Sequence, residues 1–272
     1  MLRARSDDVL LTEARATTRR VGRTFALASR LLPRGLRDDV YRLYLVFRTL
    51  DDLVDTGDPR ASERLALLEA WCSGGAAEGR EAGVLASVCA RHDLPRAAVA
   101  DFCRGMRDDL DGGAIATEAE LDEYCYRVAG TVGVVMAAVL GTSDPAAAQH
   151  AAALGKAMQR TNILRDIDED LANGRVYLAR ATLESFGSTG VVPRPASREA
   201  LLRDQIARAD ALYDEGLEGI AMLRSGRRAI ASAAAMYREI LRQIERDGYG
   251  ARPGRAVVPR SRKLLVAARA RV

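Results

Sequence analysis

Hydrophobic residues recur along this chain every three to four positions, which is the spacing of amphipathic helices, and few segments alternate as strands do. Alanine, leucine, arginine and glutamate supply much of the sequence, and all four favour helix. The pattern predicts helices over residues 7–30, 36–54, 61–73, 80–91, 96–110, 118–140, 145–172, 197–223 and 228–246. The fold class expected is therefore all-α.

Prolines stand between these periodic segments, where their missing amide does no harm to a helix. The clearest are Pro33, Pro59, Pro95 and Pro145, and Pro193, Pro195, Pro253 and Pro259 mark the later breaks. Asp144 is predicted to cap the helix that starts at Pro145. Two stretches read as loops, one near Gly74 and one that begins at Glu184. No internal repeat or low-complexity linker divides the chain, so we expect one domain over residues 1–272.

The composition, with 48% hydrophobic and 29% charged residues, is that of a soluble globular protein. We expect no membrane span, because no run approaches the length of apolar sequence that crosses a bilayer, and the N-terminus MLRARSDDVLL lacks the apolar core of a signal peptide. We therefore expect a cytoplasmic location. The two histidines and the widely spaced cysteines leave little for a zinc site or a Ser–His centre, and buried free thiols are predicted.

The positive charge is almost entirely arginine, since Lys156 and Lys263 are the only lysines. Arginine suits bidentate contact with phosphate or carboxylate, although a GC-rich codon bias produces the same preference. The tail from Arg252 to Val272 carries seven basic residues and no acidic one. Such a tail could contact nucleic acid, a membrane surface or a phosphorylated ligand, or be a solvated C-terminus.

Two sets of acidic residues have the spacing of one helical turn. Asp51 and Asp55 form the first, and Asn162, Asp166 and Asp170 form the second. Residues four apart are stacked neighbours on a helix, and like charges there repel unless a cation lies between them. Magnesium takes oxygen ligands and commonly links carboxylates to substrate phosphates. Either set alone is more often a solvated helix face.

The surroundings of both sets favour a buried site. Asp51 follows an apolar stretch that contains Tyr44, and Arg48 lies one turn before it. Two such helices facing each other around magnesium would bind a diphosphate and help it leave as a carbocation forms. The apolar stretch 128–141 offers a dry wall for that cation, and close helix packing explains its small residues equally well.

Other motifs were weighed against these. An EF-hand loop starting at Asp166 fails, because Leu171 stands where glycine is needed and Tyr177 where glutamate is needed. GTVG at 130–133 follows no strand, and neither a Walker A motif nor an NADPH site is recognised. The run DDLDGG, with Asp108, Asp109 and Asp111, is interpreted as a helix end, with a metal role as the minority view.

At this point the sequence resembles the squalene/phytoene synthase family, a branch of the all-α isoprenoid synthases. The resemblance runs from about Arg23 to Lys263, over most of the chain. It rests on RTFALASRLLP, YRLYLVFRTLDDLVD, YCYRVAGTVG, NILRDIDEDLANGRVYL and YREILRQIERDGYG, in the order of the family. The block that begins at Asn162 is highly specific. It implies a single isoprenoid-synthase helical bundle with a central cavity.

The resemblance also implies roles for individual residues. Those similar to the ligands of several Mg²⁺ ions in the family are Asp51, Asp55, Asn162, Asp166 and Asp170. Those similar to diphosphate contacts are Thr24, Arg48, Arg165, Tyr237, Arg255 and Lys263. Tyr124 resembles the tyrosine implicated near the carbocation and in proton removal, and Arg48, Asp51 and Asp166 complete the catalytic set. Those that would line the prenyl pocket are Phe25, Tyr44, Val128, Val132 and Gln159.

Three departures from the family pattern affect the acceptor. Gly22 stands where the family usually has serine, Ala114 and Ile115 where it often has Arg-Tyr, and Arg160 where an apolar residue is common.

The leading hypothesis is a magnesium-dependent prenyltransferase that joins two prenyl diphosphates, of farnesyl or geranylgeranyl length, head to head. Transfer to an aromatic acceptor, cyclisation of one prenyl diphosphate and a silent helical partner protein are the alternatives. Peripheral membrane contact is conceivable, and no nucleic-acid partner is expected.

Overall fold

A computed structural model describes residues 2–188, 195–252 and 254–270. Within these ranges every regular element is helical, and the only β-type pairing is one isolated bridge between Thr142 and Leu223. The first helices are α1 (Leu2–Arg20), α2 (Arg23–Ala28), the 3₁₀ turn η1 (Ser29–Leu31), α3 (Arg34–Asp55), α4 (Ala61–Cys72), α5 (Gly79–Cys89) and α6 (Arg96–Asp111). They are followed by α7 (Glu118–Cys125), η2 (Tyr126–Gly130), α8 (Thr131–Leu140) and α9 (Ala147–Ala172). The last are α10 (Arg180–Ser185), α11 (Pro195–Glu218), η3 (Gly219–Met222), α12 (Arg227–Arg246) and α13 (Arg260–Arg269). The all-α prediction is confirmed.

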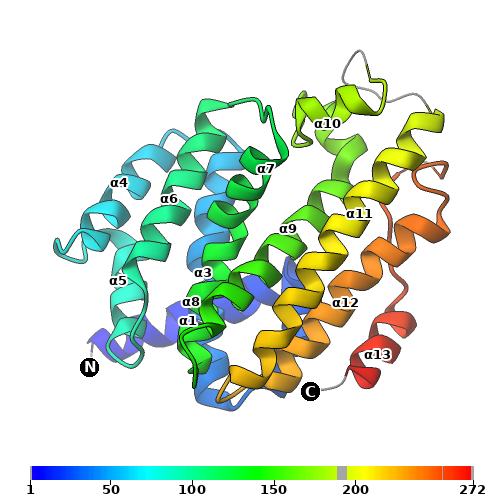
Figure 1. Ribbon diagram of the computed structural model, residues 1–272. Coiled ribbons are helices and arrows are strands. Elements are labelled where there is room, and N and C mark those ends of the chain that lie inside the picture. The colour runs from blue at the N-terminus through cyan, green and yellow to red at the C-terminus, as the bar shows by residue number, and fades with distance from the viewer. Residues whose placement is uncertain (1, 189–194, 253, 271–272) are drawn as a thin grey trace.

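Helix α9 lies in the middle of the bundle and contacts α8, α11 and α12. Figure 1 shows α3, α6 and α7 on one side of α9 and α11 and α12 on the other. The buried side chains form two large clusters, one built mainly on α3 to α6 and α8, and one on α9, α11 and α12. This arrangement places α3 and α9, the two helices with acidic ends, in the interior of one bundle. The single-domain boundary stays a prediction.

The apolar face of α3 follows helical spacing, as the sequence pattern predicted. Its buried positions include Val40, Leu43, Phe47, Leu50 and Val54. Burying each such side chain contributes on the order of 2 kcal/mol before the entropy of ordering is subtracted. The helix begins directly after Pro33, whose ring cannot continue a helix on its N-terminal side. Asp51 and Asp55 lie at the C-terminal end of this buried helix.

Small residues let α8 and η2 approach α9 closely. A Cβ atom on Gly133 would lie 2.2 Å from the carbonyl oxygen of Ala151, and one on Gly155 would lie 2.3 Å from that of Ala129. Helix packing therefore explains the glycines in this stretch. By length and hydropathy alone Glu118–Leu140 would pass for a membrane span, which the sequence analysis did not anticipate, yet here it packs within the bundle against α6 and α9.

The predicted boundaries were wrong in several places. The helix expected over 7–30 breaks between Arg20 and Arg23, and α9 starts at Ala147 because the Asp144 carboxylate accepts from the Ala146 amide at 2.8 Å in a preceding turn. The short helices α10 and α13 were not predicted, because segments of six and ten residues are too short to show a clear helical periodicity. The breaks expected at Pro193 and Pro253 lie outside the described residues. All the cysteines are free thiols, and Cys103 and Cys125 are buried.

Candidate active site

The last turn of α3 forms the first half of the candidate site. Arg48 Nη1 lies 2.9 Å from Asp51 Oδ2, and Arg48 also pairs with Asp52. The pKa of Asp51 is raised to about 6, chiefly by burial and further by the charges of Asp55 and Asp52. The positive charge of Arg48 therefore offsets part of the repulsion between these carboxylates, which helical spacing brings close together. The side chain of Asp51 remains 40% exposed, so solvent reaches this face.

The C-terminal half of α9 forms the second half. Asp166 is held by Arg165, whose Nη2 lies 2.5 Å from Oδ2, and by Arg255, whose Nε lies 2.7 Å from Oδ1. Asn162 donates from Nδ2 to Gln159 Oε1 at 3.2 Å, while its Oδ1 is buried and has no hydrogen-bond partner among the described residues. A buried carbonyl oxygen without a donor is rare, and it is available to a cation.

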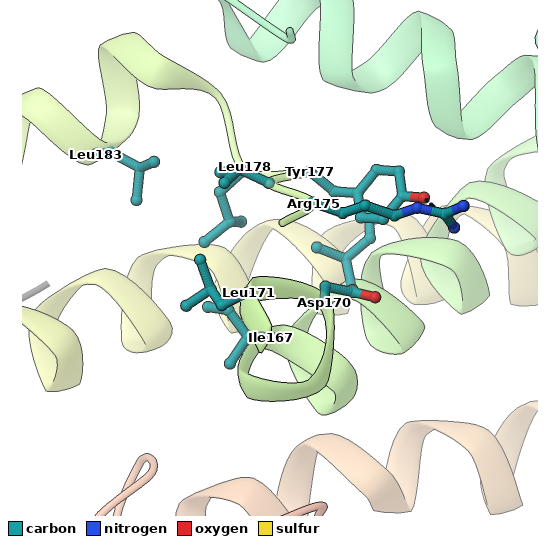
Figure 2. Close-up of a pocket in the computed structure, with 9 residues that line it drawn as sticks. Ile167, Asp170, Leu171, Arg175, Tyr177, Leu178 and Leu183 are labelled. Carbon is teal, nitrogen blue, oxygen red and sulfur yellow. Dashed lines mark hydrogen bonds between the residues drawn. The ribbon is translucent and has the colours of Figure 1, made fainter. Parts of the chain in front are cut away.

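The two halves face each other. Arg175, just after α9, donates to Asp55 Oδ1 at 2.7 Å and so ties the end of α9 to the end of α3. The pKa of Asp170 is raised to about 6 by burial first, then by the charge of Asp166 and, more weakly, by that of Asp55. Figure 2 shows Asp170 near the guanidinium of Arg175, at the rim of a cavity of about 10 Å³, which is room for roughly one water.

Asp109, on α6, lies close to these carboxylates. From the sequence, a helix end was the favoured interpretation of this residue and a role at the metal site was the minority view. Asp109 Oδ2 accepts from the Tyr124 hydroxyl at 3.2 Å. The pKa of Asp109 is raised to about 7, mainly by burial, with contributions from Asp51 and Asp55. Tyr124 in turn stacks on Tyr177, with ring centroids 5.4 Å apart. Burial and the Asp109 charge raise the pKa of Tyr124, which keeps it a neutral phenol.

The roles of Asp109, Arg175 and Tyr177 were missed at the sequence level. Arg175 and Tyr177 lie in the GRVYL end of the most specific motif, so a signal was present although no role was assigned to them. Asp109 lies in DDLDGG, where three acids before a glycine are also what an ordinary helix end contains. Only the packing of α6 against α3 and η2 separates these interpretations.

Cationic groups gather near Arg165, the partner of Asp166. Lys263, on α13, donates from Nζ to Thr24 Oγ1 at 3.2 Å. Its pKa is lowered by burial first and then by the charges of Arg165 and Arg23, so these cations lie near one another. Tyr237, on α12, hydrogen-bonds to Arg165. The residues predicted to contact diphosphate thus converge from α2, α3, α9, α12 and the C-terminal tail.

The predicted prenyl-pocket residues are all partly buried. Phe25 and Tyr44 stack with ring centroids 5.4 Å apart, and burial raises the pKa of Tyr44 to about 12. Val128 and Val132 pack against the same buried cluster as Phe25, and all three remain partly accessible. Gln159 lies one turn before Asn162 and bonds to it. The wider cavity that these residues would line stays a prediction.

Two departures from the family pattern have structural explanations. A Cβ atom at Gly22 would lie 2.8 Å from Cζ and from the hydroxyl oxygen of Tyr44, so serine does not fit there while Tyr44 keeps its place. Arg160 points away from the carboxylates: it is buried and pairs with Glu118 at 3.0 Å and Gln205 at 3.2 Å. Arg160 therefore links α9 to α7 through Glu118 and to α11 through Gln205.

The donor set matches a hard divalent cation, although the described residues contain no cluster of three acidic, histidine or cysteine side chains at metal-binding distance. Every candidate ligand offers oxygen, and Asn162 Oδ1 lacks a partner. Burial, with the charges of neighbouring carboxylates adding to it, raises the pKa of Asp51 and Asp170 to about 6, so a bound cation would favour the charged form of both. Magnesium fits such a set, since it keeps several waters and rarely needs a complete cage of protein ligands.

A sequence profile of the squalene/phytoene synthase family matches residues 18–262. The chain belongs to this family. Its sequence is 42% identical to a phytoene synthase from Thermus thermophilus over 240 residues, covering 83% of this chain and 80% of that one. It is 34% identical to a 15-cis-phytoene synthase from Synechococcus elongatus over 277 residues, covering 93% and 89%.

Solved structures agree with this assignment. A dehydrosqualene synthase in complex with a ligand superposes with a TM-score of 0.88 at 29% identity, over 98% of this chain and 96% of that one. The squalene synthase HpnC from Alicyclobacillus acidocaldarius superposes with a TM-score of 0.79 at 28% identity, over 92% and 97%. The resemblance noted from the motifs is confirmed, and this family member is an enzyme of the prenyltransferase type.

Proposed function

We propose that this protein condenses two prenyl diphosphates head to head, through a cyclopropyl intermediate, and releases diphosphate. The observation that carries the proposal is the convergence of Asp51, Asp55, Asp166 and Asp170 with Arg165 and Lys263 around one space. Carboxylates that hold a metal, next to cations that meet phosphate oxygens, are what binding and release of a diphosphate require.

The residues divide the work by position. Several magnesium ions would be held by Asp51, Asp55, Asn162, Asp166 and Asp170. Magnesium would neutralise the charge that develops on the departing diphosphate. Arg165 and Lys263 would bind the free oxygens of the leaving group, because Arg165 lies beside Asp166, Lys263 lies near Arg165, and both cations are partly shielded from water.

Tyr124 would act at the far side of the reacting carbon atoms. Its hydroxyl is oriented by Asp109, and its stacking on Tyr177 fixes the ring. A neutral phenol places an oxygen and a π face near a carbocation without introducing a second full charge. The apolar surface of Phe25, Val128 and Val132 would exclude water, which would otherwise capture the cation.

The nature of the acceptor is supported by the relatives. Those from Thermus thermophilus and Synechococcus elongatus are named phytoene synthases, which favours a second prenyl diphosphate over an aromatic acceptor. Gly22 does not weaken this choice, because the space that a serine would need is occupied by Tyr44. Phytoene or a squalene-like hydrocarbon is therefore the product proposed. Cytoplasmic location with peripheral membrane contact remains part of the proposal.

The test is incubation of the purified protein with magnesium and either geranylgeranyl or farnesyl diphosphate alone. Mass spectrometry identifies the hydrocarbon, and a colorimetric assay follows diphosphate. A product with twice the carbon atoms of the single substrate supports head-to-head coupling and identifies the chain length. Magnesium-dependent binding without any hydrocarbon would instead point to a missing acceptor. A product with the carbon number of one substrate would indicate cyclisation.

A further inference from the structure

A second hollow lies at the other end of α3 from the carboxylates. It has a volume of about 600 Å³, within the range of small-molecule sites. It is lined by Arg15, Arg19, Ala26, Arg30, Arg34, Arg37, Asp38 and Tyr41. Seventeen residues of α3 separate Arg34 from Asp51, which corresponds to about 25 Å along the helix axis. In Figure 1, α1 runs across the lower end of the bundle, where α3 begins.

The charge in this hollow is uncompensated. Asp38 is the one carboxylate in its lining, and it is engaged by Arg15, whose Nη2 lies 2.8 Å and 2.9 Å from its two oxygens. Among the described side chains, the other four arginines of the lining have no ion pair and no side-chain hydrogen bond. Gathering like charges in one concave surface is unfavourable unless an anion joins them.

Arginines elsewhere in the chain are mostly paired. On α12, Arg238 lies 2.7 Å from Asp210, and Arg242 also pairs with Asp210. On α6, Arg107 lies 2.7 Å from Glu69. The lack of acidic partners is therefore specific to the arginines of the hollow. It is not a general feature of this arginine-rich chain.

The floor of the hollow includes a buried tyrosine. Tyr41 is only 4% exposed, and its hydroxyl lies 3.1 Å from Ser29 Oγ. The arginines reach the rim from three elements, α1, η1 and α3, so a ligand would be held from several directions. Guanidinium groups contact phosphate oxygens in a planar, often bidentate way, and they remain charged at any physiological pH.

We propose that this hollow binds a phosphate-bearing anion at a second site, separate from the carboxylates of α3 and α9. Two sources share this chemistry: free diphosphate, and the headgroup of an anionic phospholipid. Leu31, which is 53% exposed, follows Arg30 directly in the chain and offers an apolar side chain to a lipid surface beside a bound headgroup. The experiment separates the two sources.

The test uses the full chain in low-salt buffer with a metal chelator, so that carboxylate repulsion disfavours diphosphate at the reaction site. Wild type is compared with Arg30→Gln/Arg34→Gln. The matched control is Arg224→Gln/Arg228→Gln, which removes the same charge at the same spacing from exposed arginines that do not line the hollow. Inorganic diphosphate is titrated by calorimetry. Sedimentation with phosphatidylglycerol/phosphatidylcholine vesicles, and with phosphatidylcholine vesicles, forms the second arm.

The proposal expects the Arg30/Arg34 variant to bind one of the probes about tenfold more weakly or worse, since two charge-assisted contacts are lost, while the control binds like wild type. Loss in the calorimetric arm identifies free diphosphate as the ligand, and loss in the phosphatidylglycerol arm identifies the lipid headgroup. The proposal is overturned if wild type binds neither probe, or if both double variants lose affinity equally, which would indicate an effect of net charge alone.

Discussion

Lys263 Nζ donates a hydrogen bond to Thr24 Oγ1 at 3.2 Å and thereby joins residues 239 positions apart in the sequence. The contact brings α13 onto α2 and places the one lysine of the basic tail near Arg165. The tail therefore supplies a cation to the candidate site. A basic tail of this composition is also typical of a solvated C-terminus. The contact of α13 with α2 distinguishes the two interpretations in favour of a tail packed against the site.

Replacing Lys263 by alanine is expected to reduce kcat/KM for diphosphate release by about 10- to 100-fold, because one charge-assisted contact to the leaving group is lost. The other lysine is the matched control. Lys156 lies 2.8 Å from Asp122 and pairs with it on the α7 side of α9. Lys156→Ala should leave kcat/KM within about twofold of wild type. Equal losses in both variants would remove Lys263 from the site.

Asp166→Asn is expected to lower diphosphate release by on the order of a hundredfold or more, since a charged ligand of the cation becomes neutral. The helical circular dichroism should not change. Asp168 provides the control: it is exposed two residues away and pairs with Arg198 at 2.6 Å. Thermal stabilisation by magnesium with diphosphate should vanish in Asp166→Asn and persist in Asp168→Asn. Full turnover in Asp166→Asn and Asp51→Asn together would refute the metal assignment.

Asp109 should make stability depend on pH. Its pKa rises from an ordinary 3.8 to about 7 in the folded state, mainly through burial, so folding favours the protonated form. The contribution of this carboxyl to stability is therefore largest below about pH 4 and is lost as pH rises through about 7. Asp109→Asn should then stabilise the magnesium-free protein by about 4 kcal/mol at pH 8, and by less than half of that at pH 5.

Urea unfolding in chelator at both pH values measures this difference. Asp108→Asn is the control, because Asp108 is exposed and pairs with Arg127 at 2.7 Å. It should give no gain in stability at pH 8. A gain at Asp109 that is the same at pH 5 and pH 8 would show that the carboxyl does not titrate in this range.

Gly22→Ser should destabilise the protein by about 1–3 kcal/mol, because the added Cβ overlaps Tyr44 and disturbs its stacking on Phe25. Gly35→Ser is the control, since a Cβ there has no neighbouring atom within 4 Å. Thermal unfolding of both variants checks the claim. A Gly22→Ser variant as stable as wild type would mean that Tyr44 has room to move.

Much of the site was readable from spacing. Asp51 and Asp55, and Asn162, Asp166 and Asp170, lie where helical periodicity and the family motifs placed them, on α3 and α9. Asp109 was not assigned to the site, because an acidic residue near a helix end has the same local signature whether it faces solvent or a buried tyrosine. Likewise the direction of Arg160 was open, since the residues that pair with it come from α7 and α11.

The sequence by itself determined the fold class, the family and the two acidic sets, because these depend on helical period and on motifs contained within one or two turns. Tertiary structure alone decided that α3 and α9 face each other through Arg175, that α13 contributes Lys263, and that four unpaired arginines share one hollow. These are relationships between segments far apart in the chain. They depend on how helices pack, which local spacing does not encode.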